Sequence, residues 1–340
     1  MSFLHYFFLF SFICFFSFVS TFFVLKYLRK KAILDHPNER SSHSIPTPRG
    51  GGIALIISIF PCLALIQFYS SEPLMGWIIV LISAFGLALL SWLDDLYTLG
   101  PAIRFISQIG AVSFCLYMLP TPEAGFLGGF LPFWVEKIIL GIGWVWFINL
   151  FNFMDGIDGI SGVEIISISF GIVILSIITP LAVAYTQAGI IFVAAALGFL
   201  KWNWHKAKIF MGDVGSIPIG FLLGWMLILL AGEGLFIPAL ILALYYLMDA
   251  TVTLLRRAMR KEKIWQAHRE HFYQKATQAN MTHAQVVIRI VFVNTILIIC
   301  ASVIHIYQAP LALIISVLSV SACLYSFEKI HHKHIAQNNT

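Results

Sequence analysis

The sequence predicts an all-α, polytopic integral membrane protein with about eleven transmembrane helices. Charged residues make up 11% of the 340 residues and apolar residues 59%, whereas an ordinary soluble domain has ~25% charged residues. The mean hydropathy is +0.89, and apolar runs of ~17 to 20 residues, long enough to cross a bilayer, recur along the whole chain. These properties exclude a water-soluble globule.

Apolar runs between polar breaks give the candidate spans in chain order. They cover residues 3–25, 51–69, 74–93, 103–119, 136–151, 162–179, 181–200, 216–231, 235–254, 286–306 and 310–327. We expect a single transmembrane domain over residues 1–340, because no internal repeat or low-complexity linker interrupts the pattern. The five cysteines lie inside the runs and predict neither a metal site nor a disulfide framework.

The distribution of basic residues predicts the orientation. When the segment after the first span is placed in the cytoplasm, 20 of the 21 Lys and Arg residues lie on or beside cytoplasmic loops, and Lys137 lies on the other side. This asymmetry is the positive-inside pattern of membrane proteins. We therefore expect a periplasmic N-terminus and a cytoplasmic C-terminus. Because basic residues follow the first span and none precedes it, we expect this span to stay as an anchor rather than to be cleaved.

The polar residues that suggest chemistry lie on the longer, cytoplasmic loops. Five segments are candidates for a catalytic surface: residues 26–50, 94–104, 149–161, 201–215 and 255–285. The first pair of carboxylates is Asp94-Asp95, at the end of the third span. Adjacent carboxylates repel each other, and at a membrane boundary the repulsion is costly unless a cation or a basic group lies between them. The alternative is a solvated helix end.

Four polar side chains recur at intervals of three at the end of the fifth predicted span: Asn149, Asn152, Asp155 and Asp158. On a helix this spacing places them on one slowly rotating stripe. Amide and carboxylate oxygens are ligands for a hard cation or a phosphate–metal complex. The stripe therefore predicts a site for such a group rather than an ordinary loop.

Asp213 stands between two glycines in the motif Phe210-Met-Gly-Asp-Val-Gly-Ser216, just before a span. By itself such an aspartate fits a helix N-cap. With three other acidic positions predicted on the same face, a metal ligand is the better interpretation. Basic residues precede the motif and could attract anions: Lys201, His205, Lys206 and Lys208.

Two further loops carry groups suited to phosphate. His268, Arg269 and His271 offer several hydrogen-bond donors to a diphosphate, although a structural role for the two histidines stays open. In the amino-terminal loop, His43 and Arg49 precede a triple glycine whose amides could approach a phosphate. This loop lacks the lysine and helix context of a Walker loop.

In combination the motifs resemble one known family. Asp94-Asp95, the Asn-x-x-Asn-x-x-Asp-Gly-Ile-Asp-Gly stretch, Phe-Met-Gly-Asp-Val-Gly-Ser and the late His-Arg-Glu-His loop, in that order over eleven spans, resemble the polyprenyl-phosphate N-acetylhexosamine-1-phosphate transferases, glycosyltransferase family 4. The resemblance covers nearly the whole chain, and the two middle motifs are highly specific. Members transfer a sugar phosphate from a UDP-sugar to a membrane lipid phosphate, use magnesium and release UMP.

The resemblance implies substrates, cofactor and place in the cell. It implies a UDP-N-acetylhexosamine and undecaprenyl phosphate as substrates, Mg²⁺ as cofactor with Mn²⁺ as a substitute, and a multi-pass protein in the bacterial inner membrane. No nucleic-acid partner is expected, and a homodimer stays open.

The resemblance also implies roles for the motif residues. Asp213 is the leading metal ligand, with Asp158 as a second one. Catalytic roles close to the metal or the phosphates fall to Asp94, Asp95, Asp155 and Asp158. The substrate-binding group comprises Asn149, Asn152, His268, Arg269, His271, His43 and Arg49. A lipid phosphate is largely dianionic at neutral pH, because its second pKa is near ~6, so Asp94 or Asp95 is expected to position it or to remove a proton only in part.

The late loop distinguishes branches of the family. The peptidoglycan branch carries a run of consecutive histidines there, whereas this chain has only His268 and His271. The compact His-Arg-Glu-His-Phe-Tyr-Gln segment looks more like the branch that initiates O-antigen synthesis with GlcNAc, FucNAc or QuiNAc. One alternative is the phospho-MurNAc-pentapeptide transferase of peptidoglycan synthesis. An ion-coupled transporter or flippase is the alternative from another class, and its carboxylates should lie near the bilayer midplane.

Overall fold

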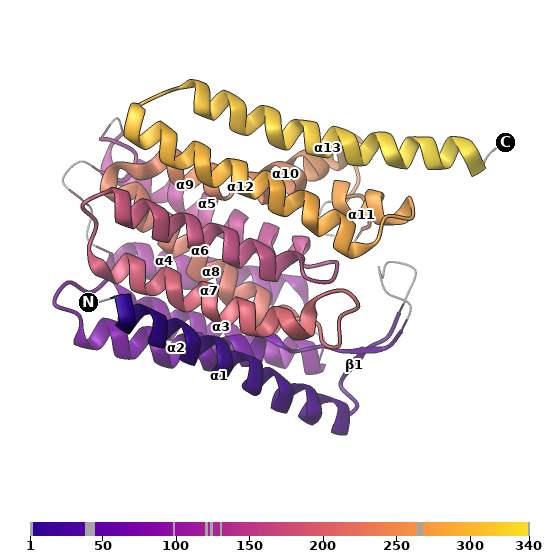
Figure 1. The fold of residues 1–340 in the computed structure, drawn as a ribbon, viewed down its shortest axis with the longest axis horizontal. Coiled ribbons are helices and arrows are strands. Elements are labelled where there is room, and N and C mark those ends of the chain that lie inside the picture. The colour runs from indigo at the N-terminus through magenta and orange to yellow at the C-terminus, as the bar shows by residue number, and fades with distance from the viewer. Residues whose placement is uncertain are drawn as a thin grey trace.

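The chain folds into a bundle of long helices that lie side by side (Figure 1). The computed structural model describes residues 3–37, 45–97, 99–119, 122, 125–129, 131–263 and 268–338. In these ranges the only sheet is a pair of two-residue antiparallel strands, β1 (Leu34–Asp35) and β2 (Thr47–Pro48). The predicted class, an all-α polytopic membrane protein, is confirmed.

The helices follow the predicted apolar runs closely. In chain order they are α1 (Phe3–Lys30), α2 (Gly52–Tyr69), α3 (Trp77–Tyr97), α4 (Pro101–Met118), α5 (Phe133–Met154), α6 (Ile160–Ile178), α7 (Val183–Asn203), α8 (Asp213–Leu230), a π-helical turn η1 (Ala231–Leu235), α9 (Phe236–Leu242), α10 (Leu244–Met259), α11 (Phe272–Gln278), α12 (His283–Tyr307) and α13 (Leu311–Asn338). Local signals set some of the starts. Pro101 opens α4 in its first turn, where its missing N–H costs nothing, and Thr282 and Gln285 form a capping box before α12.

The number of spans differs from the prediction in one region. Ten stretches of the described residues are long and apolar enough to cross a membrane, against eleven predicted. The predicted ninth span, residues 235–254, is divided at Ala243 into the short α9 and the more polar α10. Charged residues in α10, such as Asp249, lower its hydropathy below that of a span. The two helices follow one another along the bundle (Figure 1), so the chain still returns to the opposite end.

Helix α8 is the centre of the bundle. Nearly all of its residues are buried, and α2, α3 and α5 pack against it. By contrast, α1 carries a row of exposed phenylalanines and lies at the edge of the bundle (Figure 1). In lipid, helices associate through close packing and polar contacts, because the solvent is as apolar as the side chains. An example deep in the bundle is the hydrogen bond of Asn294 to Glu164, 2.7 Å long, which joins α12 to α6.

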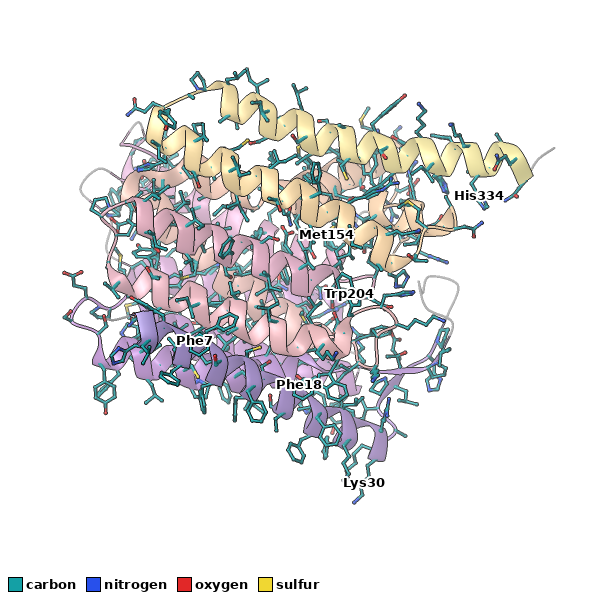
Figure 2. The ribbon with its side chains drawn as sticks, viewed as in Figure 1. Phe7, Phe18, Lys30, Met154, Trp204 and His334 are labelled. Atoms are coloured by element: carbon teal, nitrogen blue, oxygen red, sulfur yellow. The ribbon has the colours of Figure 1, made fainter. Side chains whose placement is uncertain are left out.

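The two ends of the bundle differ. The first described helix begins at one end and the last helix finishes beyond the other (Figure 1). In Figure 2, Lys30 and His334 lie toward the end opposite to Phe7. The start of α1 and the end of α13 therefore lie at opposite ends of the bundle. That the Lys30 end faces the cytoplasm stays a prediction.

Glycines allow the starts of α2 and α8 to touch. A Cβ atom on Gly52 would lie 2.1 Å from the Cα of Gly215, so neither helix has room for a side chain there. We predict that Gly52→Ala lowers the melting temperature of the detergent-purified protein, because overpacking typically costs about 1–3 kcal/mol.

The matched control is Gly86→Ala on α3, where nothing lies within 4 Å of the added methyl group. This variant should keep or raise the melting temperature, because alanine favours a helix over glycine. Equal melting curves for the two variants would contradict the packing argument.

Candidate active site

Charged side chains from separate parts of the sequence meet where three helices begin. Asp213 is the first residue of α8, Arg104 lies in the first turn of α4, and Arg49 directly precedes the triple glycine at the start of α2. Helix N-termini carry unpaired N–H groups and a partial positive charge. The backbone therefore makes this end of the bundle favourable for anions before any side chain is considered.

Asp213 accepts hydrogen bonds from three side chains. One oxygen lies 2.6 Å from Arg49 and 3.1 Å from the amide nitrogen of Asn152, and the other lies 3.0 Å from Arg104. The residue is the first of α8 and makes no capping hydrogen bond, since Gly212 occupies the N-cap position. The N-cap alternative is therefore wrong, and the carboxylate points away from its own helix.

Asp94 and Asp95, at the end of α3, are paired with the same two arginines. Arg104 lies 3.2 Å from Asp94, and Arg49 lies 3.3 Å from Asp95. The second oxygen of Asp95 accepts the backbone N–H of Val214 at 3.3 Å. Basic groups therefore separate the two adjacent carboxylates, as their repulsion required.

The cluster carries more negative than positive charge. Among the described residues, the three carboxylates of Asp94, Asp95 and Asp213 contact two guanidinium groups. Although burial lowers the pKa of Arg49, Asp213 and Asp95 hold it above its ordinary value. Arg49 is thus a permanent cation, and the excess negative charge leaves room for a further cation.

The amino-terminal loop is tied to the Asp213 motif by its backbone. The amides of Gly50 and Gly51 donate to the carbonyl of Phe210, and that of Gly52 donates to Met211. The expectation that these glycine amides approach a phosphate is therefore wrong, because they are already used within the protein. The tie holds Arg49 beside Asp213.

The polar side chains of the stripe at the end of α5 have different hydrogen-bond partners. Asn152 donates to Asp213 and also to Ser216 at 2.8 Å, whereas Asn149 donates to Gln108 of α4 at 2.6 Å. Burial raises the pKa of Asp155 to about 6, against a hydrogen bond with Ser161 that lowers it. The proximity of Asp213 also raises this pKa, which places Asp155 within the electrostatic reach of the cluster.

Asp158 has different neighbours. One of its oxygens lies 2.8 Å from Nδ1 of His205, 3.1 Å from Nδ1 of His283 and 3.2 Å from the amide of Ala207. Burial acts to raise the pKa of Asp158, but the hydrogen bonds to the two histidines hold it below its ordinary value. The two predicted metal ligands, Asp213 and Asp158, thus have separate sets of contacts.

The late loop folds back onto the bundle. The side chain of His271 is 2% exposed and lies 3.5 Å from Asp249. The hydroxyl of Tyr273 donates to the carbonyl of Phe153, which connects the loop to the end of α5. Burial and the charge of His271 lower the pKa of His268 to about 3, so this imidazole is neutral at physiological pH.

Arg269 is partly buried, and its carbonyl accepts a hydrogen bond from Gln278. His43 lies outside the described residues. With His271 enclosed, the loop offers a substrate a partly exposed His268 and Arg269 rather than two open imidazoles.

Sequence reasoning missed several residues at the site. Arg104 is the most important, since it joins Asp94 to Asp213. It stands at the beginning of a predicted span, where a cation is costly in lipid, and that cost was a usable signal. Gln108 gave no signal, because a single uncharged polar side chain inside a span is common, and Ser216 was part of the Asp213 motif but had no role assigned to it. The sequence indicates His205 only as one of several basic residues that could attract anions, and it assigns no role to His283.

An apolar groove runs along the bundle, and residues that flank Arg104 in the sequence line it. It has a volume of about 910 Å³ and lies between α4 and α5, with Pro101 and Asn149 near one end and Lys137 near the other. Ile109 and Ile142 line it and are largely exposed, so the groove is open along the side of the bundle. A long hydrocarbon chain could lie in such a groove with a polar head at the cluster.

The sequence was compared with known proteins. Residues 77–231 match the sequence model described as "Glycosyl transferase family 4". A "Probable undecaprenyl-phosphate N-acetylglucosaminyl 1-phosphate transferase" from Bacillus subtilis is 27% identical over 81% of this chain and 78% of its own length. A "Decaprenyl-phosphate N-acetylglucosaminephosphotransferase" from Mycolicibacterium smegmatis is 28% identical over 80% of this chain and 76% of its own. A "Phospho-N-acetylmuramoyl-pentapeptide-transferase" from Chlamydia pneumoniae is 29% identical over 62% of this chain and 69% of its own length.

The fold is that of a multi-pass membrane protein with a charged cluster at one end of the bundle. The matches support the polyprenyl-phosphate hexosamine-1-phosphate transferase family for this chain. The apolar helices and the bacterial relatives indicate a multi-pass protein of the bacterial inner membrane.

The raised pKa of Asp155 predicts a pH-dependent stability. In the folded protein the pKa of Asp155 is about 6, whereas that of an ordinary aspartate is 3.8. The stabilisation by the neutral carboxyl is complete below pH 3.8 and is lost as the pH rises through about 6. One pKa unit corresponds to ~1.36 kcal/mol, so the loss is at most about 3 kcal/mol.

We therefore expect the melting temperature of Asp155→Asn, relative to the wild type, to rise between pH 4.5 and about 6 and then to stay constant. The measurement is made without divalent metal ions. Glu72→Gln, at an exposed loop position, is the control and should show no such rise. A difference for Asp155→Asn that is independent of pH would contradict the prediction.

Proposed function

We propose that the protein transfers an N-acetylhexosamine-1-phosphate from a UDP-sugar to undecaprenyl phosphate at the cytoplasmic face of the inner membrane and releases UMP. The observation that carries this proposal is the cluster of Asp94, Asp95, Asp213, Arg49 and Arg104 beside a groove for a hydrocarbon chain. The named relatives support the same reaction type, since they use polyprenyl phosphates.

The cluster supplies what phosphoryl transfer needs. Two polyanions, a diphosphate and a lipid phosphate, must approach each other, and an enzyme achieves this mainly by neutralising charge and aligning the groups. Arg49 and Arg104 provide permanent positive charge, and their side chains are 38% and 32% exposed, so a substrate can reach them. The starts of α2, α4 and α8 add partial positive charge.

The donor set fits a magnesium ion. Mg²⁺ takes oxygen ligands, and one or two carboxylates suffice because the ion retains waters. We propose Asp213 as the main ligand, with Asp155 as a further candidate. When bound, the ion supplies charge neutralisation at the diphosphate. Asp158 lies against two imidazoles, which makes it a weaker candidate for this ion than the sequence predicted.

The protein's residues position the acceptor. We propose that the polyprenyl chain lies between α4 and α5 and that its phosphate reaches the cluster near Asn149 and Arg104. An oxygen of the lipid phosphate then forms a bond to the sugar-bearing phosphorus of the donor, and the bond from that phosphorus to UMP breaks. A dianionic phosphate needs no base, and Asp94 and Asp95 are held by arginines, so we assign them to positioning.

For the donor we propose a GlcNAc, FucNAc or QuiNAc type of sugar and a role in starting O-antigen or related cell-surface polysaccharide synthesis. The compact late loop, with two histidines rather than a longer run, supports this choice. The phospho-N-acetylmuramoyl-pentapeptide transferase activity is the second candidate, favoured by the relative from Chlamydia pneumoniae. The position of the carboxylates at one end of the bundle argues against a transporter, which needs a site near the midplane.

A panel of donors tests the function. Purified protein with undecaprenyl phosphate and Mg²⁺ should release UMP with at least one UDP-N-acetylhexosamine and not with UDP-MurNAc-pentapeptide. Asp213→Asn should abolish release, whereas Glu72→Gln at an exposed loop position should leave it unchanged. Absence of UMP with every sugar would overturn the proposed activity, and release only with UDP-MurNAc-pentapeptide would favour the second candidate.

Filling the groove tests the acceptor site. Ile142→Trp places a larger side chain in the groove, so we expect the KM for undecaprenyl phosphate to rise about tenfold with little change in the KM for the UDP-sugar. Ile82→Trp, on the exposed surface of α3, is the control. Equal effects of the two substitutions would show that the chain binds elsewhere.

A further inference from the structure

A second group of metal-ligating atoms lies apart from the contacts of Asp213. It consists of Asp158, between α5 and α6, His205, between α7 and α8, and His283, the first residue of α12. One ligand atom from each residue lies within 4.8 Å of the other two. Segments separated by 47 and 125 positions in the sequence therefore converge on one carboxylate oxygen.

The distances suit direct coordination. The Asp158 oxygen lies 2.8 Å from Nδ1 of His205 and 3.1 Å from Nδ1 of His283. A tetrahedral zinc ion has ligands at about 2.0 Å, which places neighbouring ligand atoms about 3.3 Å apart. Small side-chain shifts would thus open a site for the ion. His205 is 25% exposed and gives access from solvent, whereas Asp158 and His283 are enclosed.

The hydrogen bonds around His283 also favour a cation. The backbone N–H of Asp158 points to Nδ1 of His283 at 3.2 Å, which is where a lone pair would accept it. The same nitrogen faces the Asp158 carboxylate oxygen at 3.1 Å. Two electron-rich atoms at this distance repel each other unless a positive centre, a proton or a metal ion, lies between them.

We propose that Asp158, His205 and His283 bind a divalent transition-metal ion of the zinc type. Imidazole nitrogens select such ions, whereas Mg²⁺ prefers an all-oxygen shell. The amide of Ala207 donates to the same carboxylate and would orient it, as a neighbouring donor does in many metal sites. The site is distinct from the magnesium site of the proposed function and does not depend on it.

The bound ion would hold three loops together. Asp158 follows the stripe that contains Asn152 and Asp155, His205 precedes Asp213 by eight residues, and His283 follows the late loop. A cross-link between these segments would fix the positions of the residues that line the proposed active site. The ion would therefore act on structure, and its removal should lower stability.

Cobalt absorption provides the test. The full chain is purified in detergent through a tag without histidines, stripped with a chelator and titrated with Co²⁺. The tail histidines His331, His332 and His334 are replaced by Gln in every sample, since they could bind the ion on their own. We expect one equivalent of Co²⁺ with the visible bands of a low-coordinate site, displacement of those bands by Zn²⁺, and a higher melting temperature with metal.

Variants identify the ligands. His205→Gln should weaken Co²⁺ binding at least about tenfold and remove the thermal shift, while His305→Gln, a histidine near the other end of α12, should change neither. His205→Cys should restore binding with a new thiolate-to-cobalt band, which shows that the protein is folded and that position 205 is a ligand. Wild-type binding in His205→Gln, or no binding in the parent protein, would overturn the proposal and leave a proton between the groups.

Discussion

The pairing of Asp213 with Arg49 and Arg104 is the interaction on which the arrangement of this end of the bundle depends. A carboxylate at the start of a nearly fully buried helix is costly unless charges of opposite sign compensate it. The two guanidinium groups do so, and they also bring α2, α3, α4 and α8 to one point, because each arginine additionally contacts Asp94 or Asp95. Removal of either arginine would leave Asp94 or Asp95 without its arginine and Asp213 with one arginine instead of two.

This electrostatic centre requires backbones that come unusually close. Gly52 and Gly215 leave no space for side chains between the starts of α2 and α8, and the amides of the triple glycine are bonded to Phe210 and Met211. The sequence suggests phosphate binding for these glycines, but their hydrogen bonds and the close contact between the two helices give them a packing role. The loop thus holds Arg49 at Asp213.

Apolar length and motif order predicted most of the fold and part of the site. Spans follow from composition because lipid forces every backbone group into a helix, and the carboxylate motifs are local in sequence. The partners of Arg104 and of Asp158 could not be predicted in the same way, since these contacts join segments more than 40 residues apart. The predicted ninth span was wrong as a single helix, because α10 carries charged residues that lower its hydropathy. One of them, Asp249, accepts the backbone amides of Phe272 and Tyr273 and so anchors the late loop.

The acidic residues of the stripe therefore separate by the chemistry of their neighbours. Asp155 faces the electrostatic field of Asp213 and Arg49, where oxygen ligands and excess negative charge favour a hard cation. Asp158 lies three residues further, in the connection between α5 and α6, and faces two imidazoles, where a borderline ion or a proton is favoured. Two aspartates only three positions apart in the sequence thus have different surroundings: oxygen atoms around Asp155 and imidazole nitrogens around Asp158. If both are occupied, the second ion stabilises the loop on which the first depends, without contacting the substrate.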